Sequence, residues 1–305
     1  MSKGMRILDF FLDGCIAVFP RTFVKKLFCF LGGFLCKTGY RKLWNYNTEI
    51  VQKTLILNRK KAMGIAYNSF LNQYDFLVDY NIMAMKSLNE VRRLSEKVSV
   101  QDREKIKSIL DCGRPIIIVS IHMDSFLLGL FRVCDIIQNK RPITAIKFSN
   151  SSQKEDFAYS KFAQIGVPIK VLRLTDKPGI ESLRDLRNGN ILFVFCDIYS
   201  NWAKTVSISF FGRKTQFISG PAELAIASKA LILPLFVYKD RTSKQENHIL
   251  QIEDVIDPLD FKNASFSEKT LCISQAIGVY VENWVRKHPD QWQMWSILPG
   301  MWGKV

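Results

Sequence analysis

The sequence predicts an α/β fold with a central mixed, largely parallel sheet flanked by helices and an N-terminal membrane-associating helical segment. Short apolar runs rich in β-branched residues alternate with segments of helical spacing through the middle of the chain. Of its 305 residues, 48% are hydrophobic and 23% are charged, which suffices for a sizeable core. Residues 1–61 hold 12 Lys+Arg against 3 Asp+Glu, so the basic charge is concentrated at the N-terminus.

The N-terminal segment, residues 1–61, combines this charge with two apolar stretches, Ile7–Phe19 and Phe23–Cys36. Neither reaches the roughly 20 apolar residues that cross a bilayer, and no small-residue cleavage site of a secretory signal follows them. Apolar stretches with interspersed charges favour helices that lie in the interface of an anionic membrane. Amphipathic helices docked on the core are the alternative. The interrupting charges are Asp9, Asp13, Lys25 and Lys26.

Residues 62–305 are predicted to form the α/β domain, and its first part is helical. The apolar spacing from Glu49 to Lys97 predicts two or three helices. A further helix over Asp102–Leu110 ends before Gly113 and leads into the first long strand. Five aromatic residues of the helical region are expected to pack in the core: Tyr67, Phe70, Tyr74, Phe76 and Tyr80.

The stretch around His122 organises the rest of the domain. Pro115–Ile121 is a run of β-branched and apolar residues after a turn signal, which predicts a buried parallel strand that stops at His122. Asp124 then precedes a segment of helical spacing and is expected to cap that helix. Ligands of open α/β sheets bind beyond the carboxyl ends of the strands, so His122 stands where a catalytic histidine would act. A structural histidine is the alternative.

Three further strands are predicted downstream: Pro142–Phe148, Val167–Leu174 and Ile191–Cys196. Helical segments separate them, as in an α/β sheet with crossover helices. The last of these strands ends on Asp197 in the same way that the earlier strand ends on His122. We therefore expect Asp197 and His122 to meet in one crevice, although 75 positions separate them.

The order of several motifs resembles the bacterial lipid A late acyltransferases and the wider lysophospholipid acyltransferases. That family carries His-x-x-x-x-Asp/Glu at a strand-to-helix junction; here His122 matches, but the carboxylate position is Leu127. The family also has paired arginines after its closing tryptophans, where this chain has Ser296–Trp302. The other matching elements are Asp197, Phe210-Phe-Gly-Arg213, Gly220-Pro-Ala-x-Leu-Ala225, Leu233-Pro-Leu-Phe236 and Pro289-x-Gln-Trp292.

The resemblance implies acyl transfer from a thioester of acyl carrier protein or coenzyme A to a hydroxyl or amine, with no further cofactor. His122 would be the general base. Because Leu127 lacks a carboxylate, Asp124 and Asp197 are the two candidates to orient it. The motif carboxylate and the terminal arginines of the family are both altered here. The acceptor is therefore either a lipid A-type intermediate or an intermediate of a secondary-metabolite pathway.

Two basic residues are candidates for binding the phosphate-bearing substrate. Lys147, at the end of its predicted strand, falls near a position where the family has a basic residue, and a solvated lysine is the alternative. Arg213 belongs to the Phe-Phe-Gly-Arg element and could instead simply close a turn.

Other classes of function fit the sequence poorly. The three histidines are not at metal-ligand spacing, and there is no G-x-S-x-G, Walker or G-x-G-x-x-G motif. The net charge of +15 predicts an anionic partner, and its concentration among apolar residues favours a membrane surface over nucleic acid. A peripheral protein at the cytoplasmic face of the bacterial inner membrane is expected. The rival hypothesis is a catalytically silent relative that binds an acyl chain or carrier protein as a scaffold.

Overall fold

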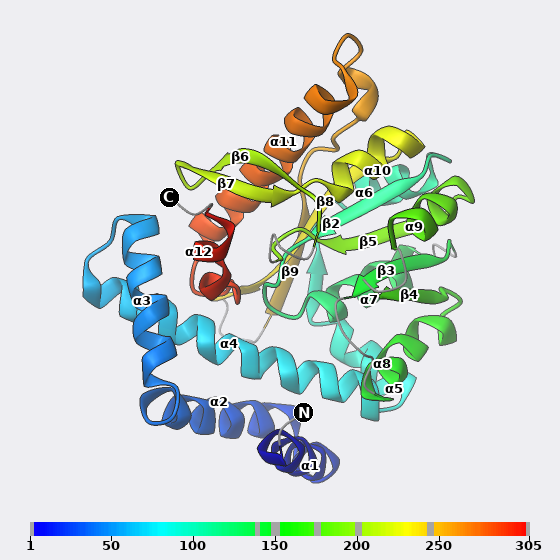
Figure 1. Ribbon diagram of the computed structural model, residues 1–305. Helices are drawn as coiled ribbons and strands as arrows, with labels where there is room; N and C mark the ends of the chain where they lie inside the picture. Colours follow the sequence, from blue (N-terminus) through cyan, green and yellow to red (C-terminus); the bar gives the residue numbers. More distant parts are fainter. Residues whose placement is uncertain are drawn as a thin grey trace.

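A seven-stranded sheet lies at the centre of the computed structural model, which describes residues 3–137, 141–147, 153–173, 178–198, 203–242 and 247–302. The strand order is β1-β9-β8-β2-β5-β3-β4, and every neighbouring pair is parallel except β8 and β9 (Figure 1). The predicted mixed, mostly parallel sheet is confirmed. Its strands are β1 (Val98–Val100), β2 (Ile116–Ser120), β3 (Ile143–Lys147), β4 (Ile169–Arg173), β5 (Ile191–Phe195), β8 (Leu231–Asp240) and β9 (Asn247–Ile252).

The central strand β2 is buried on both faces, which explains its unbroken apolar sequence. Successive side chains of a strand point to opposite faces, so Ile116 and Ile118 belong to one hydrophobic cluster and Ile117 and Val119 to the other. Helices α6 (Arg103–Asp111), α7 (Phe126–Ile137) and α8 (Gln153–Gln164) contribute to the first cluster, whereas α9 (Pro178–Arg187), α10 (Gly220–Ser228) and α11 (Phe266–Lys287) contribute to the second.

A two-stranded hairpin explains the Phe-Phe-Gly-Arg element. Strands β6 (Thr205–Phe210) and β7 (Arg213–Ile218) pair antiparallel, and the two residues between them, Phe211 and Gly212, have φ of 51° and 70°. A two-residue turn with positive φ at both positions matches the twist of a hairpin, and glycine adopts it without strain. The last helix, α12 (Leu298–Met301), ends the described chain.

Five helices precede the first long strand: α1 (Lys3–Val18), α2 (Arg21–Lys37), α3 (Arg41–Leu55), α4 (Arg59–Met85) and α5 (Leu88–Ser95). Helix α4 crosses below the sheet, with α2 against its outer side (Figure 1). The two helices approach closely at Gly32 and Gly33. A Cβ atom would stand 2.7 Å from the Tyr74 ring at Gly32 and 2.5 Å from the Tyr67 hydroxyl at Gly33.

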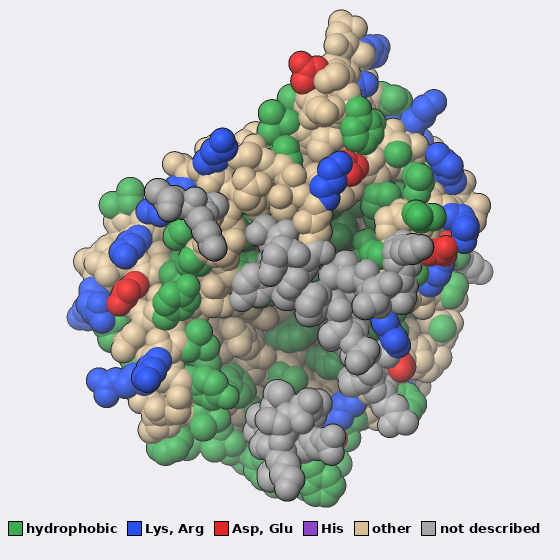
Figure 2. Space-filling model, viewed as in Figure 1, with side chains coloured by type: hydrophobic (Ala, Val, Ile, Leu, Met, Phe, Trp, Pro, Cys, Tyr) green, Lys and Arg blue, Asp and Glu red, His purple; other side chains and the backbone are tan. Residues whose placement is uncertain are grey.

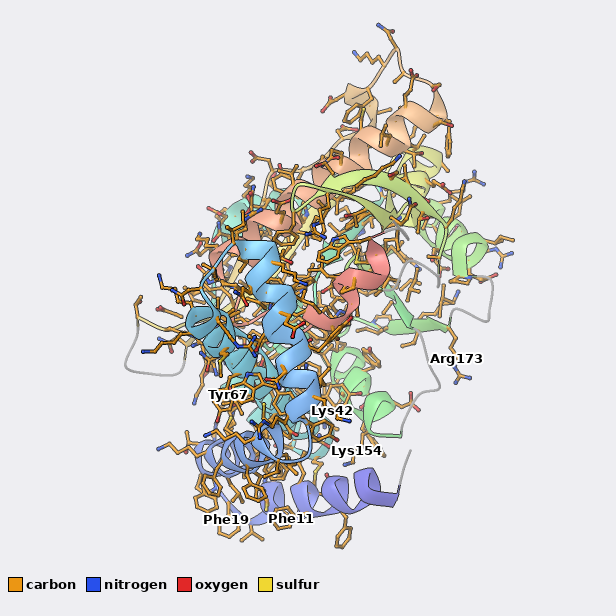
Figure 3. The ribbon with its side chains drawn as sticks, turned by 60° about the vertical axis from the view of Figure 1, so that its left-hand side comes forward. Phe11, Phe19, Lys42, Tyr67, Lys154 and Arg173 are labelled. Carbon is orange, nitrogen blue, oxygen red and sulfur yellow. The ribbon has the colours of Figure 1, made fainter. Side chains whose placement is uncertain are left out.

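The outer face of α1 and α2 is unusually apolar for a surface. Hydrophobic side chains gather along the lower edge of the molecule, over these helices (Figure 2), and Phe11 and Phe19 lie at that edge (Figure 3). Phe10, Phe30 and Phe34 are 82%, 73% and 61% exposed. No helix in the described ranges is long and apolar enough to cross a membrane.

Candidate active site

His122 and Asp197 meet because of the register between β2 and β5. The two strands are parallel neighbours with Ser120 paired to Phe195, so the second residue after each strand reaches the same level of the sheet edge. The pairing continues past the strands, where the Cys196 N–H donates to the Ser120 carbonyl at 3.0 Å. The sheet thus brings together two side chains that are far apart in the sequence.

The two side chains form a hydrogen-bonded histidine–carboxylate pair. Nδ1 of His122 lies 2.8 Å from Oδ1 of Asp197, and the backbone N–H of His122 donates to Oδ2 at 2.8 Å. The Asp197 side chain is 2% exposed and that of His122 is 24% exposed. Because a carboxylate only accepts, a neutral His122 donates from Nδ1 and keeps Nε2 as a proton acceptor. No group in the described part of the chain hydrogen-bonds to Nε2.

Aromatic rings hold the imidazole in place. The ring of Phe195, the last residue of β5, stacks on His122 with centroids 4.1 Å apart and planes at 25°. Phe126, at the start of α7, meets His122 edge-on at 5.9 Å and also stacks on Phe76 of α4 at 4.9 Å. These contacts leave the imidazole little freedom to turn away from Asp197.

His122 also lines a largely apolar cleft of about 590 Å³ between α3, α4 and the segment that follows α11. Three of the aromatic residues expected in the core also line this cleft: Phe70, which is buried, Tyr74, which packs against the core, and Phe76. The other lining residues are Tyr40, Leu43, Gln73, Leu77, Gln293, Met294, Ser296 and Ile297.

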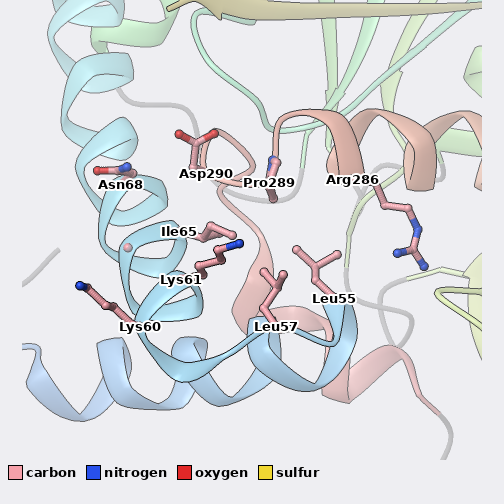
Figure 4. Close-up of a pocket in the computed structure, with 10 residues that line it drawn as sticks. Leu55, Leu57, Lys60, Lys61, Ile65, Asn68, Arg286, Pro289 and Asp290 are labelled. Atoms are coloured by element: carbon pink, nitrogen blue, oxygen red, sulfur yellow. The ribbon is translucent and has the colours of Figure 1, made fainter.

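A second cavity, of about 540 Å³, is lined by residues of α3, α4 and the end of α11 (Figure 4). Leu55 and Leu57 form its apolar floor, with Lys60 and Lys61 on one side and Arg286 on the other. His122 is not among its lining residues, so we do not place the chemistry there.

Asp124 does not cap α7, which corrects the sequence-based expectation. Its backbone adopts φ of 46°, and its Oδ2 lies 2.5 Å from Nδ1 of His248 on β9. Both side chains are fully buried, at 1% and 0% exposure. Asp124 therefore belongs to a separate histidine–carboxylate pair: its side chain hydrogen-bonds to His248, whereas that of Asp197 hydrogen-bonds to His122.

A buried charge network extends from this second pair to the N-terminal helices. Arg21 of α2 lies 3.4 Å from Nε2 of His248 and binds Asp79 of α4 at 2.7 Å, and Lys25 binds Asp79 at 2.8 Å. Burial alone would raise the pKa of Asp79, but Lys25 and Arg21 hold it well below its usual value. The pKa of Asp124 is likewise lowered, because the adjacent His248 outweighs the effect of burial.

The remaining predicted residues lie outside the pair. Leu127 is 4% exposed and packs in the core on α7. Lys147 ends β3, and its side chain lies outside the described part of the chain. Arg213 stacks over Trp302 at 4.4 Å and is not a lining residue of the His122 cleft. The substrate-binding roles of Lys147 and Arg213 stay predictions.

The fold is that of an α/β enzyme whose polar groups gather at the carboxyl ends of parallel strands. The chain belongs to the bacterial lipid A biosynthesis acyltransferase family, whose sequence model matches residues 8–297. It is also 27% identical over 148 residues to phosphatidylinositol mannoside acyltransferase of Mycolicibacterium smegmatis (strain ATCC 700084 / mc(2)155). That match covers 47% of this chain and 46% of the relative, about half the length of each.

Sequence reasoning missed three neighbours of the pair. Phe195 and Phe126 were not singled out, although Phe126 directly precedes Leu127 and Phe195 lies two residues before Asp197. Trp292 was noticed only as part of a resemblance, and in the structure its indole N–H donates to Oδ2 of Asp197 at 2.9 Å. Only the fold brings Trp292 to a residue 95 positions away.

Proposed function

We propose that the protein transfers an acyl chain from a thioester to a hydroxyl or amine, with His122 as general base and Asp197 as the carboxylate that orients it. The acceptor gives its proton to Nε2 of His122 as its oxygen or nitrogen bonds to the thioester carbonyl carbon. The carbon–sulfur bond then breaks, and the thiol leaves with the proton held by His122. Asp197 keeps the imidazole in the tautomer that accepts at Nε2.

The single observation that carries this proposal is the His122–Asp197 pair at the wall of an apolar cleft. Asp197 supplies the carboxylate that the motif position Leu127 lacks. An unpaired Nε2 beside an apolar volume suits a base that meets a polar group attached to an acyl chain. Phe70, Tyr74 and Leu77 of α4 would contact that chain.

The donor in this proposal is a thioester of acyl carrier protein or coenzyme A, and the acceptor is a lipid A-type or secondary-metabolite intermediate. Family membership supports lipid biosynthesis as the setting. A silent scaffold is disfavoured because the pair retains hydrogen bonds and partial exposure that binding alone does not require.

We also propose that residues 1–61 seat the protein on the cytoplasmic face of the bacterial inner membrane. The exposed phenylalanines of α1 and α2 would enter the interface, and the basic excess of the segment would favour anionic lipids. A donor and an acceptor with acyl chains would then meet the cleft near the surface that holds them.

The decisive experiment measures acyl transfer by His122→Ala. Purified protein is supplied with acyl thioesters of carrier protein and coenzyme A and a panel of hydroxyl and amine acceptors. The variant is expected to lose transfer by at least about 1,000-fold while unfolding at a similar temperature, because a partly exposed side chain adds little to the core. His288→Ala, which changes a histidine outside the cleft, is the matched control. A His122→Ala rate equal to that of the wild type would refute the base assignment, and wild-type protein without product would favour the scaffold.

A further inference from the structure

The closing Pro289–Trp292 element contacts the His122–Asp197 pair through Trp292. The proposed reaction assigns no role to this element. We propose that Trp292 is a positioning residue for that reaction: its indole N–H holds one oxygen of Asp197 so that the other oxygen faces His122. The inference rests on the proposed function, because it assigns a role at the same site.

The hydrogen bonds on Asp197 are divided between its two oxygens. Oδ2 accepts from the His122 backbone N–H at 2.8 Å and from Nε1 of Trp292 at 2.9 Å, whereas Oδ1 faces Nδ1 of His122 at 2.8 Å. The terminal torsion of an aspartate side chain is broad and sets no orientation by itself. Two donors converging on one oxygen fix the carboxylate plane, and the second oxygen is thereby directed at the imidazole.

The indole is itself held rigidly. Trp292 is fully buried and meets Trp295 edge-on with centroids 4.9 Å apart. Its backbone forms a bridge with Met123, the residue after His122, and its carbonyl accepts from the Ser69 hydroxyl of α4. The donor therefore keeps its place relative to the loop that carries His122.

The residues on either side of Trp292 anchor the same segment. Gln291, 1% exposed, accepts from the Lys239 N–H at 2.7 Å and donates to the Lys239 carbonyl at 3.0 Å, which ties it to β8. The Gln293 N–H donates to the His122 carbonyl at 3.0 Å. The Gln-Trp pair of the motif thus has two tasks: Gln291 docks the segment on the sheet, and Trp292 holds the carboxylate.

Trp295 provides a matched control within the same segment. It is as fully buried as Trp292, but its N–H donates to the Pro289 carbonyl at 2.8 Å and not to Asp197. A tryptophan that merely fills the core would behave like Trp295 when its N–H is removed. A positioning tryptophan would affect the rate of transfer as well.

The test compares Trp292→Phe with Trp295→Phe in the full-length protein, using an acyl thioester and an acceptor that the wild type converts. Trp292→Phe is expected to lower kcat about 10- to 100-fold, the equivalent of one hydrogen bond to a charged group, with the donor KM within about twofold. Trp295→Phe is expected to keep kcat within about threefold. Nitrogen-15 NMR of labelled histidine should show His122 as the Nδ1–H tautomer in the wild type and a mixture of tautomers in Trp292→Phe.

Non-additivity provides the second readout. In an Asp197→Ala background Trp292→Phe should cost no further activity, because the indole acts through the carboxylate. Equal losses of kcat in the two tryptophan variants, or full additivity with Asp197→Ala, would overturn the inference. An inactive wild type or an unaffected His122→Ala would instead overturn the proposed function. If Trp292→Phe does not fold, 3-benzothienylalanine at position 292 keeps the bicyclic shape, replaces N–H by sulfur, and makes the same comparison.

Discussion

The molecule contains two histidine–aspartate pairs of the same local geometry in two different settings. In both, Nδ1 of the histidine faces a carboxylate oxygen, at 2.8 Å for His122–Asp197 and 2.5 Å for His248–Asp124. They differ at the other nitrogen. Nε2 of His248 faces the Arg21 guanidinium at 3.4 Å inside the core, whereas the His122 side chain is 24% exposed and lines the cleft.

A histidine–carboxylate pair is therefore not by itself a catalytic signature. A general base needs an acceptor nitrogen that substrate can reach. In the buried pair that nitrogen, Nε2 of His248, already faces Arg21. The His248–Asp124 pair instead joins α2, α4 and the loop after His122 through Asp79. In the proposed function the His122–Asp197 pair serves proton transfer, whereas the His248–Asp124 pair holds elements of the fold together.

The largest effect on acyl transfer is expected for Asp197→Asn. The two N–H donors on Oδ2 will retain the amide oxygen, so the amide NH₂ will face Nδ1 of His122. The imidazole must then carry its proton on Nε2, where it cannot accept one from the acceptor. On the template of catalytic triads the loss in kcat is about 10,000-fold, measured by steady-state transfer from an acyl thioester. A loss below about tenfold would show that Asp197 does not set the tautomer.

The next effect concerns the stability of the buried pair. His248→Ala leaves the Asp124 carboxylate buried without its partner, so the free energy of unfolding is expected to fall by about 3–5 kcal/mol. Urea unfolding monitored by tryptophan fluorescence measures it. Transfer by the folded fraction should stay within about tenfold of the wild type. His122→Ala is the mirror-image control, since it should spare stability and abolish transfer. If His248→Ala abolished transfer at unchanged stability, the division of roles between the pairs would be wrong.

The part of the site that the sequence predicts follows from local patterns. Uninterrupted apolar runs identify β2 and β5 as buried strands, and a polar residue after each places His122 and Asp197 at one edge of the sheet. The choice between Asp124 and Asp197 depends on strand register, which pairs Ser120 with Phe195 and has no signature in a single sequence. Asp124 has the local pattern of a helix cap, but His248, 124 positions away, engages it. The contact of Trp292 with Asp197 could not be predicted either, because it also joins residues that are far apart in the sequence.

The smallest expected effect involves His288, which has no hydrogen-bonded carboxylate among the described residues. It stacks on Tyr238 at 4.2 Å and on Trp284 at 5.5 Å, and burial together with Lys287 lowers its pKa from 6.5 to about 4. The folded protein therefore resists protonation of His288 while the unfolded chain accepts it. The stability contributed by the neutral ring is complete above pH 6.5 and is lost as the pH falls toward 4.

His288→Phe keeps an aromatic ring in the stack and removes this titration. Between pH 7 and pH 4, urea unfolding of the wild type should show a decline in stability that is about 1 kcal/mol larger than in the variant, a value reduced by solvent screening of a half-buried group. Asp79 and Asp124, whose pKa values are lowered from 3.8, lose their contribution only below about pH 4 and leave this window clear. Identical slopes in the two proteins would mean that His288 titrates alike in both states. His288 would then differ from His122 and His248 for a reason other than its lack of a carboxylate partner.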